Sequence, residues 1–137
     1  MNKDIGRRAE RELVNILRNY GFKSVRIPTS NSSSNPLPDV FAIYGKNLLS
    51  IEVKSTWEKK VKVKELQIKK IIDFITMFPL KGRALIVVKF KGREWKVTEV
   101  ETVNDIVVSE ENSIPLHEYI LRIINVELTS RESVVMT

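Results

Sequence analysis

The 137-residue sequence contains no cysteine and a single histidine, His117. Without cysteine, the chain cannot form a disulfide scaffold, a cysteine-ligated zinc site or a thiol nucleophile. One histidine cannot build a histidine metal site, and it cannot readily build a catalytic triad. A metal ion bound here would therefore be held by oxygen ligands, which are the ligands that hard cations prefer.

Long apolar runs are also missing. No segment approaches the roughly 18–20 apolar residues that a membrane span needs. The N-terminal sequence MNKDIGRRAERE lacks the apolar core of a signal peptide. We therefore expect a cytoplasmic protein with no membrane partner, and the length is that of one domain.

Basic residues are concentrated in the first two thirds of the chain. Residues 1–96 hold 21 lysines and arginines against 9 acids and so carry +12, whereas residues 97–137 carry −6. A domain-sized segment this basic favours a polyanionic partner, most simply nucleic acid. The competing interpretation is that the lysines only keep a small protein soluble.

Apolar periodicity and turn residues predict an α/β fold. Stripes at helical spacing predict helices over residues 4–20, 62–78 and 116–128. Apolar runs bounded by turn residues predict strands over residues 22–27, 39–44, 48–55, 83–90 and 94–100. We expect a central mixed sheet of about five strands flanked by helices, in one domain over residues 1–128, followed by a flexible C-terminal tail over residues 129–137.

The most informative residues lie on two of these strands. Pro38-Asp39 opens one strand, and Glu52-Val53-Lys54 lies in the next, after a short turn at residues 45–47. Because residues two apart on a strand share a face, Glu52 and Lys54 stand side by side. The hairpin returns Asp39 to within about a residue of the level of Glu52. Two carboxylates and one ammonium group are therefore expected at one end of one sheet face.

Two close carboxylates repel each other unless a cation lies between them. Mg²⁺ accepts such oxygen ligands and keeps several waters, one of which can act as a nucleophile. Lys54 can stabilise the charge that builds on a phosphate group. The pattern predicts phosphodiester hydrolysis, against the alternative that Asp39 caps a loop and Glu52 and Lys54 form a surface pair worth ~0.2–1 kcal/mol.

A third acid can come from the first helix. Glu10 and Glu12 lie at similar angles on the two borders of its apolar stripe. Periodicity does not choose between them.

At these residues the sequence resembles the archaeal Holliday junction resolvases, a group within the PD-(D/E)xK nuclease superfamily. The resemblance covers roughly residues 4–96. It is carried by GRRAEREL (6–13) in the first helix and by four further matches: RIPTS (26–30), PLPD (36–39), IEVKS (51–55) and Gln67 in the second helix.

The resemblance implies a restriction-endonuclease-like fold and a metal site of Glu10, Asp39 and Glu52, with Lys54 as the catalytic lysine. It favours Glu10 over Glu12, and it makes Ser30 and Gln67 further candidate catalytic residues. It implies Mg²⁺, for which Mn²⁺ can substitute, and no small-molecule cofactor. It also implies a homodimer that cuts two opposed strands of a four-way junction and leaves 5′-phosphate and 3′-hydroxyl ends, in a cytoplasmic, nucleoid-associated setting.

Basic residues flank the expected site. We expect phosphate contacts from Arg7, Arg8, Arg11, Arg26, Lys59, Lys60, Lys62 and Lys64. Trp57 can stack on an unpaired base, although a place in the core or at a dimer interface is the favoured expectation. The last helix, with Tyr119, Ile120 and Ile124, is the expected surplus surface for a dimer.

Two rival functions remain at this point. One is a restriction-like or repair nuclease acting on flap or duplex DNA. The other is a non-catalytic DNA-binding protein on the same fold, which should have lost Asp39, Glu52 or Lys54, and none of these is lost.

Overall fold

The computed structural model describes residues 3–28 and 35–136, with side chains described over residues 5–28 and 35–131. The elements in chain order are α1 (Lys3–Asn19), β1 (Lys23–Arg26), β2 (Val40–Tyr44), β3 (Asn47–Thr56), β4 (Lys60–Val63), α2 (Glu65–Ile75), β5 (Lys81–Phe90), β6 (Trp95–Val100), β7 (Ile106–Ser109), β8 (Ile114–Pro115) and α3 (Leu116–Met136).

A six-stranded mixed sheet forms the centre, in the order β1-β2-β3-β5-β6-β8. Strands β3 and β5 pair in parallel over ten residues, and the other neighbours in this sheet are antiparallel. The expected α/β architecture with a central mixed sheet is confirmed. The sequence analysis predicted about five strands and did not find the two-residue strand β8.

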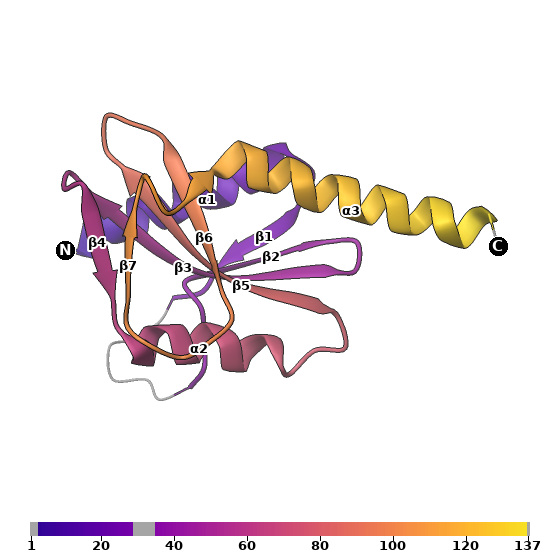
Figure 1. The fold of residues 1–137 in the computed structure, drawn as a ribbon, viewed down its shortest axis with the longest axis horizontal. Helices are drawn as coiled ribbons and strands as arrows, with labels where there is room; N and C mark the ends of the chain where they lie inside the picture. Colours follow the sequence, from indigo (N-terminus) through magenta and orange to yellow (C-terminus); the bar gives the residue numbers. More distant parts are fainter. Residues whose placement is uncertain (1–2, 29–34, 137) are drawn as a thin grey trace.

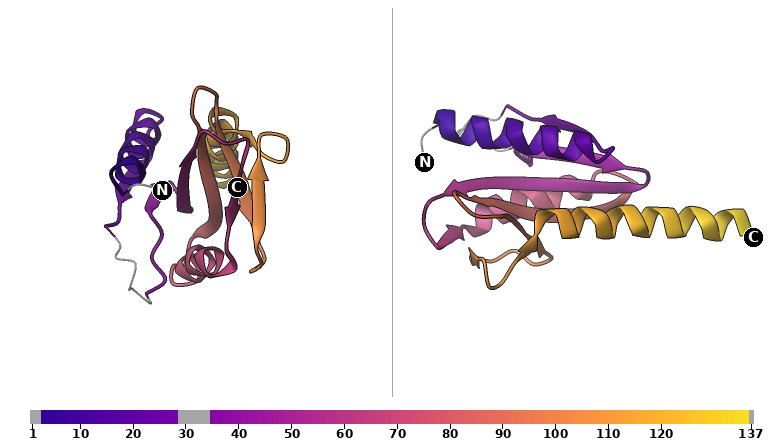
Figure 2. Two further views of the ribbon diagram at one scale, coloured as in Figure 1. Left: turned by 90° about the vertical axis from the view of Figure 1, so that its left-hand side faces the viewer. Right: turned by 90° about the horizontal axis from the view of Figure 1, so that it is seen from above.

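Helices cover both faces of this sheet, with α1 and α3 on one face and α2 on the other (Figures 1 and 2). Each face of the sheet carries its own hydrophobic core, and the side chains of strand β5 alternate between these two cores. Leu85 and Val87 pack with α1 and α3, whereas Ile86 and Val88 pack with α2. A strand buried on both faces reads as a continuous apolar run, which is the pattern of residues 83–90.

The predicted helix over residues 62–78 is too long at both ends. Residues Lys60–Val63 instead form β4, which pairs with β7 in a separate two-stranded sheet. Val63 is buried between polar neighbours, a period of two that favours a strand. Phe78, the last residue of the predicted helix, lies after the observed one and is 37% exposed. The β4–β7 pairing joins residues about 45 apart, and local periodicity could not show it.

The last helix begins as expected at Leu116 but continues to Met136, beyond the predicted end at residue 128. The segment expected to be a flexible tail is therefore helical in its described part, and it projects from the body of the protein (Figure 1). Tyr119 and Ile120 are buried in the core, so they cannot supply a dimer surface, and Ile124 packs against the same core. No described helix is both long and apolar enough to span a membrane.

Glu127 anchors this helix to the turn between β2 and β3. Its buried carboxylate accepts hydrogen bonds from the Asn47 side chain (2.9 Å), the Lys46 backbone N–H (3.3 Å) and Arg131 (3.2 Å). Gly45, with φ +59°, lies directly against this carboxylate, where a side chain would collide with it. The turn and the helix therefore fit together only with glycine at that position.

Replacing Glu127 with alanine should lower the free energy of unfolding by about 1–3 kcal/mol, because the buried side-chain amide of Asn47 and the partly buried backbone N–H of Lys46 lose their acceptor. Urea titration measures this loss. Glu118→Ala is the matched control, since Glu118 pairs with Arg122 on the exposed side of the same helix; its expected effect is below about 0.5 kcal/mol. Equal effects of the two substitutions would show that the anchor contributes nothing.

Candidate active site

The β2–β3 register brings Asp39 opposite Glu52. Val40 pairs with Ile51, so Asp39, one residue earlier, lies level with Glu52. The backbone N–H of Asp39 donates to the Ile51 carbonyl (3.0 Å), and its carboxylate accepts a hydrogen bond from the Val53 N–H (2.9 Å). The carboxyl groups of Asp39 and Glu52 are also hydrogen-bonded to each other. Backbone geometry therefore holds this acidic pair.

Glu10 approaches the pair from α1. Its carboxylate forms an ion pair with Arg26, at the end of β1, with 3.2 Å between Oε1 and Nε. It is close enough to Asp39 and Glu52 for their charges to interact. Glu12, by contrast, pairs with Lys89 on β5 at 2.6 Å. The tie that periodicity left between the two glutamates is thus resolved by the packing of α1.

Lys54 is the one lysine on β3, and it lies close to the acidic pair. It lies two residues after Glu52, and its charge stabilises the ionised forms of both Asp39 and Glu52. The intervening Val53 is buried in the core beneath α1 and α3. Strand alternation therefore turns Glu52 and Lys54 together to the other face, as expected.

Burial and mutual repulsion make these carboxyls unusually weak acids. Burial raises the pKa of Glu52 to about 8, and the neighbouring Asp39 charge adds to this effect. Burial likewise raises the pKa of Glu10 to about 7, with a further contribution from Asp39 and an opposing one from Arg26. Burial also raises the pKa of Asp39, although the Val53 N–H opposes the shift. The site therefore favours bound protons or a bound cation over free negative charge.

The chemistry of the donors suits a hard divalent cation. Within residues 3–28 and 35–136, no three acidic or histidine side chains are already arranged as a metal-ligand group. Asp39 and Glu52 are nevertheless in contact, and Glu10 lies near them with Arg26 as its present partner. Carboxylate oxygens are the ligands that Mg²⁺ uses, and a bound cation would favour the ionised forms of these carboxyls, which burial disfavours.

Two further residues, Ser30 and Gln67, were predicted to be catalytic. Ser30 falls outside the described residues. The Gln67 side-chain oxygen accepts a hydrogen bond from the Lys64 backbone N–H (3.4 Å) at the start of α2. Among the described contacts none joins Gln67 to the carboxylates, so its catalytic role stays a prediction.

The predicted phosphate-binding residues are mostly exposed. Arg7, Arg8 and Arg11 are exposed on α1, and Lys59, Lys60, Lys62 and Lys64 are exposed on or beside β4. Lys62 forms a long ion pair with Asp105 (3.6 Å). Arg26 is only partly exposed and is engaged by Glu10.

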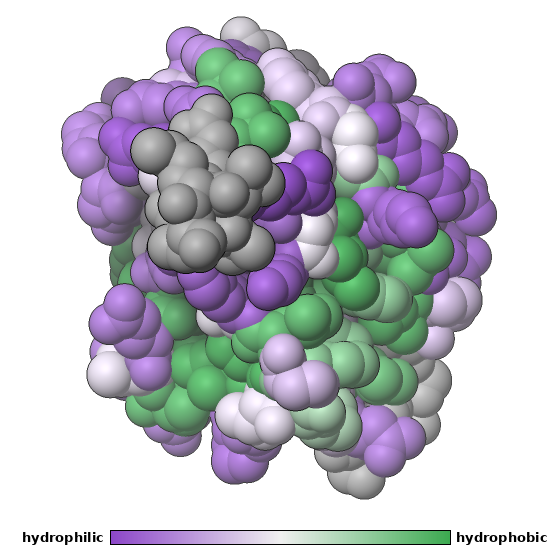
Figure 3. Space-filling view, turned by 90° about the vertical axis from the view of Figure 1, so that its right-hand side faces the viewer, coloured by the Kyte–Doolittle hydropathy of each residue, from purple (hydrophilic) through white to green (hydrophobic). Residues whose placement is uncertain are grey.

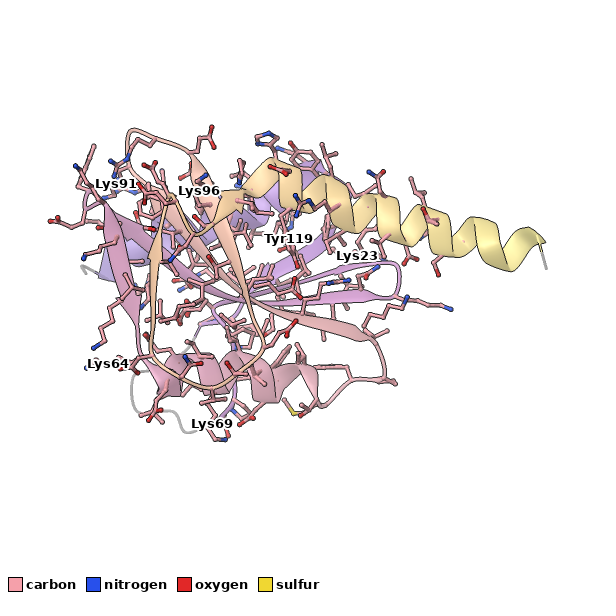
Figure 4. The ribbon with its side chains drawn as sticks, in the orientation of Figure 1. Lys23, Lys64, Lys69, Lys91, Lys96 and Tyr119 are labelled. Atoms are coloured by element: carbon pink, nitrogen blue, oxygen red, sulfur yellow. The ribbon has the colours of Figure 1, made fainter. Side chains whose placement is uncertain are left out.

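Sequence reasoning missed two lysines of the same end of the protein. Lys91 and Lys96 lie with Lys64 towards the end that carries β4 and the start of α1 (Figure 4). They flank the turn between β5 and β6, and only the total charge of the chain hinted at them. Trp57, expected in the core or at a dimer interface, is 73% exposed in this chain, so the core expectation is wrong.

Comparison with known proteins points to one family. Residues 1–127 match the family model described as archaeal Holliday junction resolvase (Hjc). The chain is 61% identical over 119 residues to "Crossover junction endodeoxyribonuclease Hje" of Saccharolobus solfataricus, covering 86% of this chain and 88% of that protein. It is 60% identical over 121 residues to the protein of the same name from Sulfolobus acidocaldarius, covering 88% and 87%.

A solved structure shares the fold. The crystal structure of Archaeoglobus fulgidus Hjc, a Holliday junction resolvase from an archaeal hyperthermophile, matches with a TM-score of 0.73 at 24% identity. The match covers 84% of this chain and 99% of that one. At this identity the likeness shows the common fold, which is the restriction-endonuclease-like fold expected from the sequence.

The raised pKa values predict how stability depends on pH in the absence of metal. The unfolded chain loses these protons near the ordinary glutamate value of 4.5, whereas the folded protein keeps them until about pH 7–8. The stability contributed by protonation of Glu10 and Glu52 is therefore fully present below pH 4.5, and it is lost as the pH rises through the pKa values of the folded protein. With EDTA, the free energy of unfolding should fall by roughly 2–4 kcal/mol between pH 5 and pH 8.

Glu52→Gln is the matched variant, because it removes one carboxyl and relieves its neighbours. Urea titrations at both pH values should show a much smaller decline for this variant. Adding Mg²⁺ at pH 8 should stabilise the unmodified protein more than the variant. A wild-type stability that does not change between the two pH values would contradict the assignment of a proton-loaded site.

Proposed function

This chain belongs to the archaeal Holliday junction resolvase family, and from that we propose that it is a metal-dependent endodeoxyribonuclease that resolves four-way DNA junctions. The observation that carries the proposal is the group formed by Asp39, Glu52, Glu10 and Lys54 in a chain of this family. The names of its 60–61% identical relatives support the same activity.

Asp39, Glu52 and Glu10 would hold the metal, which we propose is Mg²⁺, with Mn²⁺ able to substitute. When bound, the ion would supply an activated water and polarise the scissile phosphate. Before that, Glu10 would have to exchange its contact with Arg26 for the ion. The Val53 N–H orients Asp39 throughout, because this hydrogen bond comes from the rigid backbone of β3.

Lys54 would stabilise the negative charge that develops on the phosphate. Its ammonium group lies on the same strand face as Glu52, so it is positioned by the sheet rather than by a loop. Ser30 and Gln67 stay predicted catalytic residues: Ser30 as a contact to the scissile phosphate and Gln67 as a ligand to water or metal.

We propose that the basic end binds DNA through phosphates and shape. The residues that would make these contacts are Arg7, Arg8, Arg11, Arg26, Lys59, Lys60, Lys62 and Lys64, joined by Lys91 and Lys96. A four-way junction has two-fold related strands, so a homodimer with two sites would match it and make paired cuts. The products would carry 5′-phosphate and 3′-hydroxyl ends.

The nuclease domain would comprise residues 1–128. The opposite end of the protein, rather than the start of α3, offers apolar surface for a dimer. A hollow of about 400 Å³ there is lined by residues of β1 and β2, including Val25, Phe41 and Ile43. Figure 3 shows apolar side chains gathered across this face. We propose that the protein acts on DNA in the cytoplasm, at the nucleoid.

Junction cleavage is the direct test of this function. At matched salt and with Mg²⁺, the protein should cut a four-way junction at least tenfold faster than a flap or a linear duplex of the same sequence. Gel analysis of end-labelled strands gives the rates, and EDTA should abolish cutting. Equal rates on the three DNAs would favour a restriction-like or repair nuclease instead.

Asp39→Asn and Glu52→Gln should separate cutting from binding. Each removes a proposed metal ligand with little change in shape, so the cleavage rate should fall at least 10³-fold. Junction affinity, measured by gel shift in EDTA, should stay within about threefold of the unmodified value. Glu12→Gln is the matched control, since Glu12 lies on α1 beside Glu10 but pairs with Lys89 of β5, and the variant should keep full activity. Normal cutting by both Asp39→Asn and Glu52→Gln would refute the site.

A further inference from the structure

Trp57 is the most exposed large apolar side chain among the described residues, at 73%. It follows β3 directly, three residues after Lys54. A single exposed apolar side chain is common on protein surfaces, so its surroundings decide whether it binds a partner. A ring at this position could be buried favourably against a bound group.

A hollow of about 490 Å³ connects this ring to the proposed catalytic lysine. Its lining includes Lys54, Ser55, Thr56, Trp57, Ile5 of α1 and Lys91 of the β5–β6 turn. The volume exceeds that of one nucleobase. A group bound in the hollow would therefore touch both the Trp57 ring and the side chain proposed to act on the phosphate.

Trp57 is held in place from one side. The Lys91 ammonium group lies 5.7 Å from the centre of its ring, a cation–π contact. Gly92 lies beside the ring, where a Cβ would be in ordinary van der Waals contact with it at 3.5 Å. With both neighbours on the β5–β6 turn, the ring is supported on that side while most of it stays open to solvent.

The surroundings favour an anionic polymer. Lys54 and Lys91 line the hollow, and Lys64 and Lys96 lie at the same end of the protein (Figure 4). Glu58 is the one acidic side chain in the lining, and it is fully at the surface. Ser55 adds a hydroxyl that is buried and has no hydrogen-bond partner among the described residues.

We propose that Trp57 is a specificity-determining residue that stacks on a nucleobase displaced at the branch point of the DNA, with Lys91 on an adjoining phosphate. The inference rests on the proposed function and deepens it. Base pairs at a branch point lack a continuous stacking neighbour, so a base there leaves the stack at lower cost than one in a duplex. Stacking on Trp57 would therefore favour branched over linear DNA.

Two readouts test this in EDTA, so that no cutting occurs. In a Trp95→Phe background Trp57 is the only tryptophan, and its emission should be quenched by a four-way junction more than by a linear duplex at matched salt. Trp57→Ala should weaken junction binding about tenfold, in line with the loss of one stacked base, and leave duplex binding within twofold. Trp57→Phe keeps a stacking face and should lose at most threefold.

Leu66→Ala is the matched control, because Leu66 is 69% exposed on α2 and does not line the hollow. It should alter neither affinity. An equal loss of junction and duplex affinity in Trp57→Ala would overturn the proposal. So would Trp57 emission that ignores DNA but changes with protein concentration, which would place the ring against a second copy of the chain.

The unmodified protein separates this inference from the proposed function. If it fails to prefer the junction over the duplex, the proposed function is wrong. If it prefers the junction and Trp57→Ala keeps the full preference, only the stacking role is wrong.

Discussion

Burial of three neighbouring carboxyl groups governs the chemistry of this protein. Glu10 on α1, Asp39 just before β2 and Glu52 on β3 each have a raised pKa because burial opposes ionisation, and the charge of Asp39 adds to this at Glu10 and Glu52. Such a group costs folding free energy at neutral pH unless something positive compensates it. Arg26 and Lys54 supply part of that compensation, and the remainder is the reason for proposing a divalent cation at this site.

The sheet keeps these groups together in spite of the repulsion. Strand β3 is paired on both sides, with β2 and β5, and β5 is buried on both faces. The Asp39 carboxylate is held by a backbone N–H, so it cannot turn away without breaking a hydrogen bond. The paired central strands thus keep the carboxylates close together, whereas flexible loops would let them move apart. The strands also hold Lys54 at a defined place beside the acids.

The two ends of the molecule are chemically different. The carboxyl ends of β3 and β5 face the end that carries β4, the exposed Trp57, and Lys64, Lys91 and Lys96 (Figure 4). The opposite end carries the apolar face of Figure 3 and the projecting part of α3. The proposed binding of DNA at one end and of a second copy at the other would benefit from this separation, because like charges repel each other at a shared surface.

Residue spacing was sufficient to foresee the three helices, the main strands and the pair formed by Asp39 and Glu52. These features follow from local backbone periods of 3.6 and 2 and from the short turn at residues 45–47. Folding in three dimensions was needed to separate Glu10 from Glu12, because their helical angles are equivalent until α1 packs on the sheet and Arg26 and Lys89 each take one. The same holds for β4, which forms by pairing with the distant β7, and for Trp57, whose exposed ring contacts Lys91 of the distant β5–β6 turn. Such contacts join residues far apart along the chain, and their energies are absent from any local pattern.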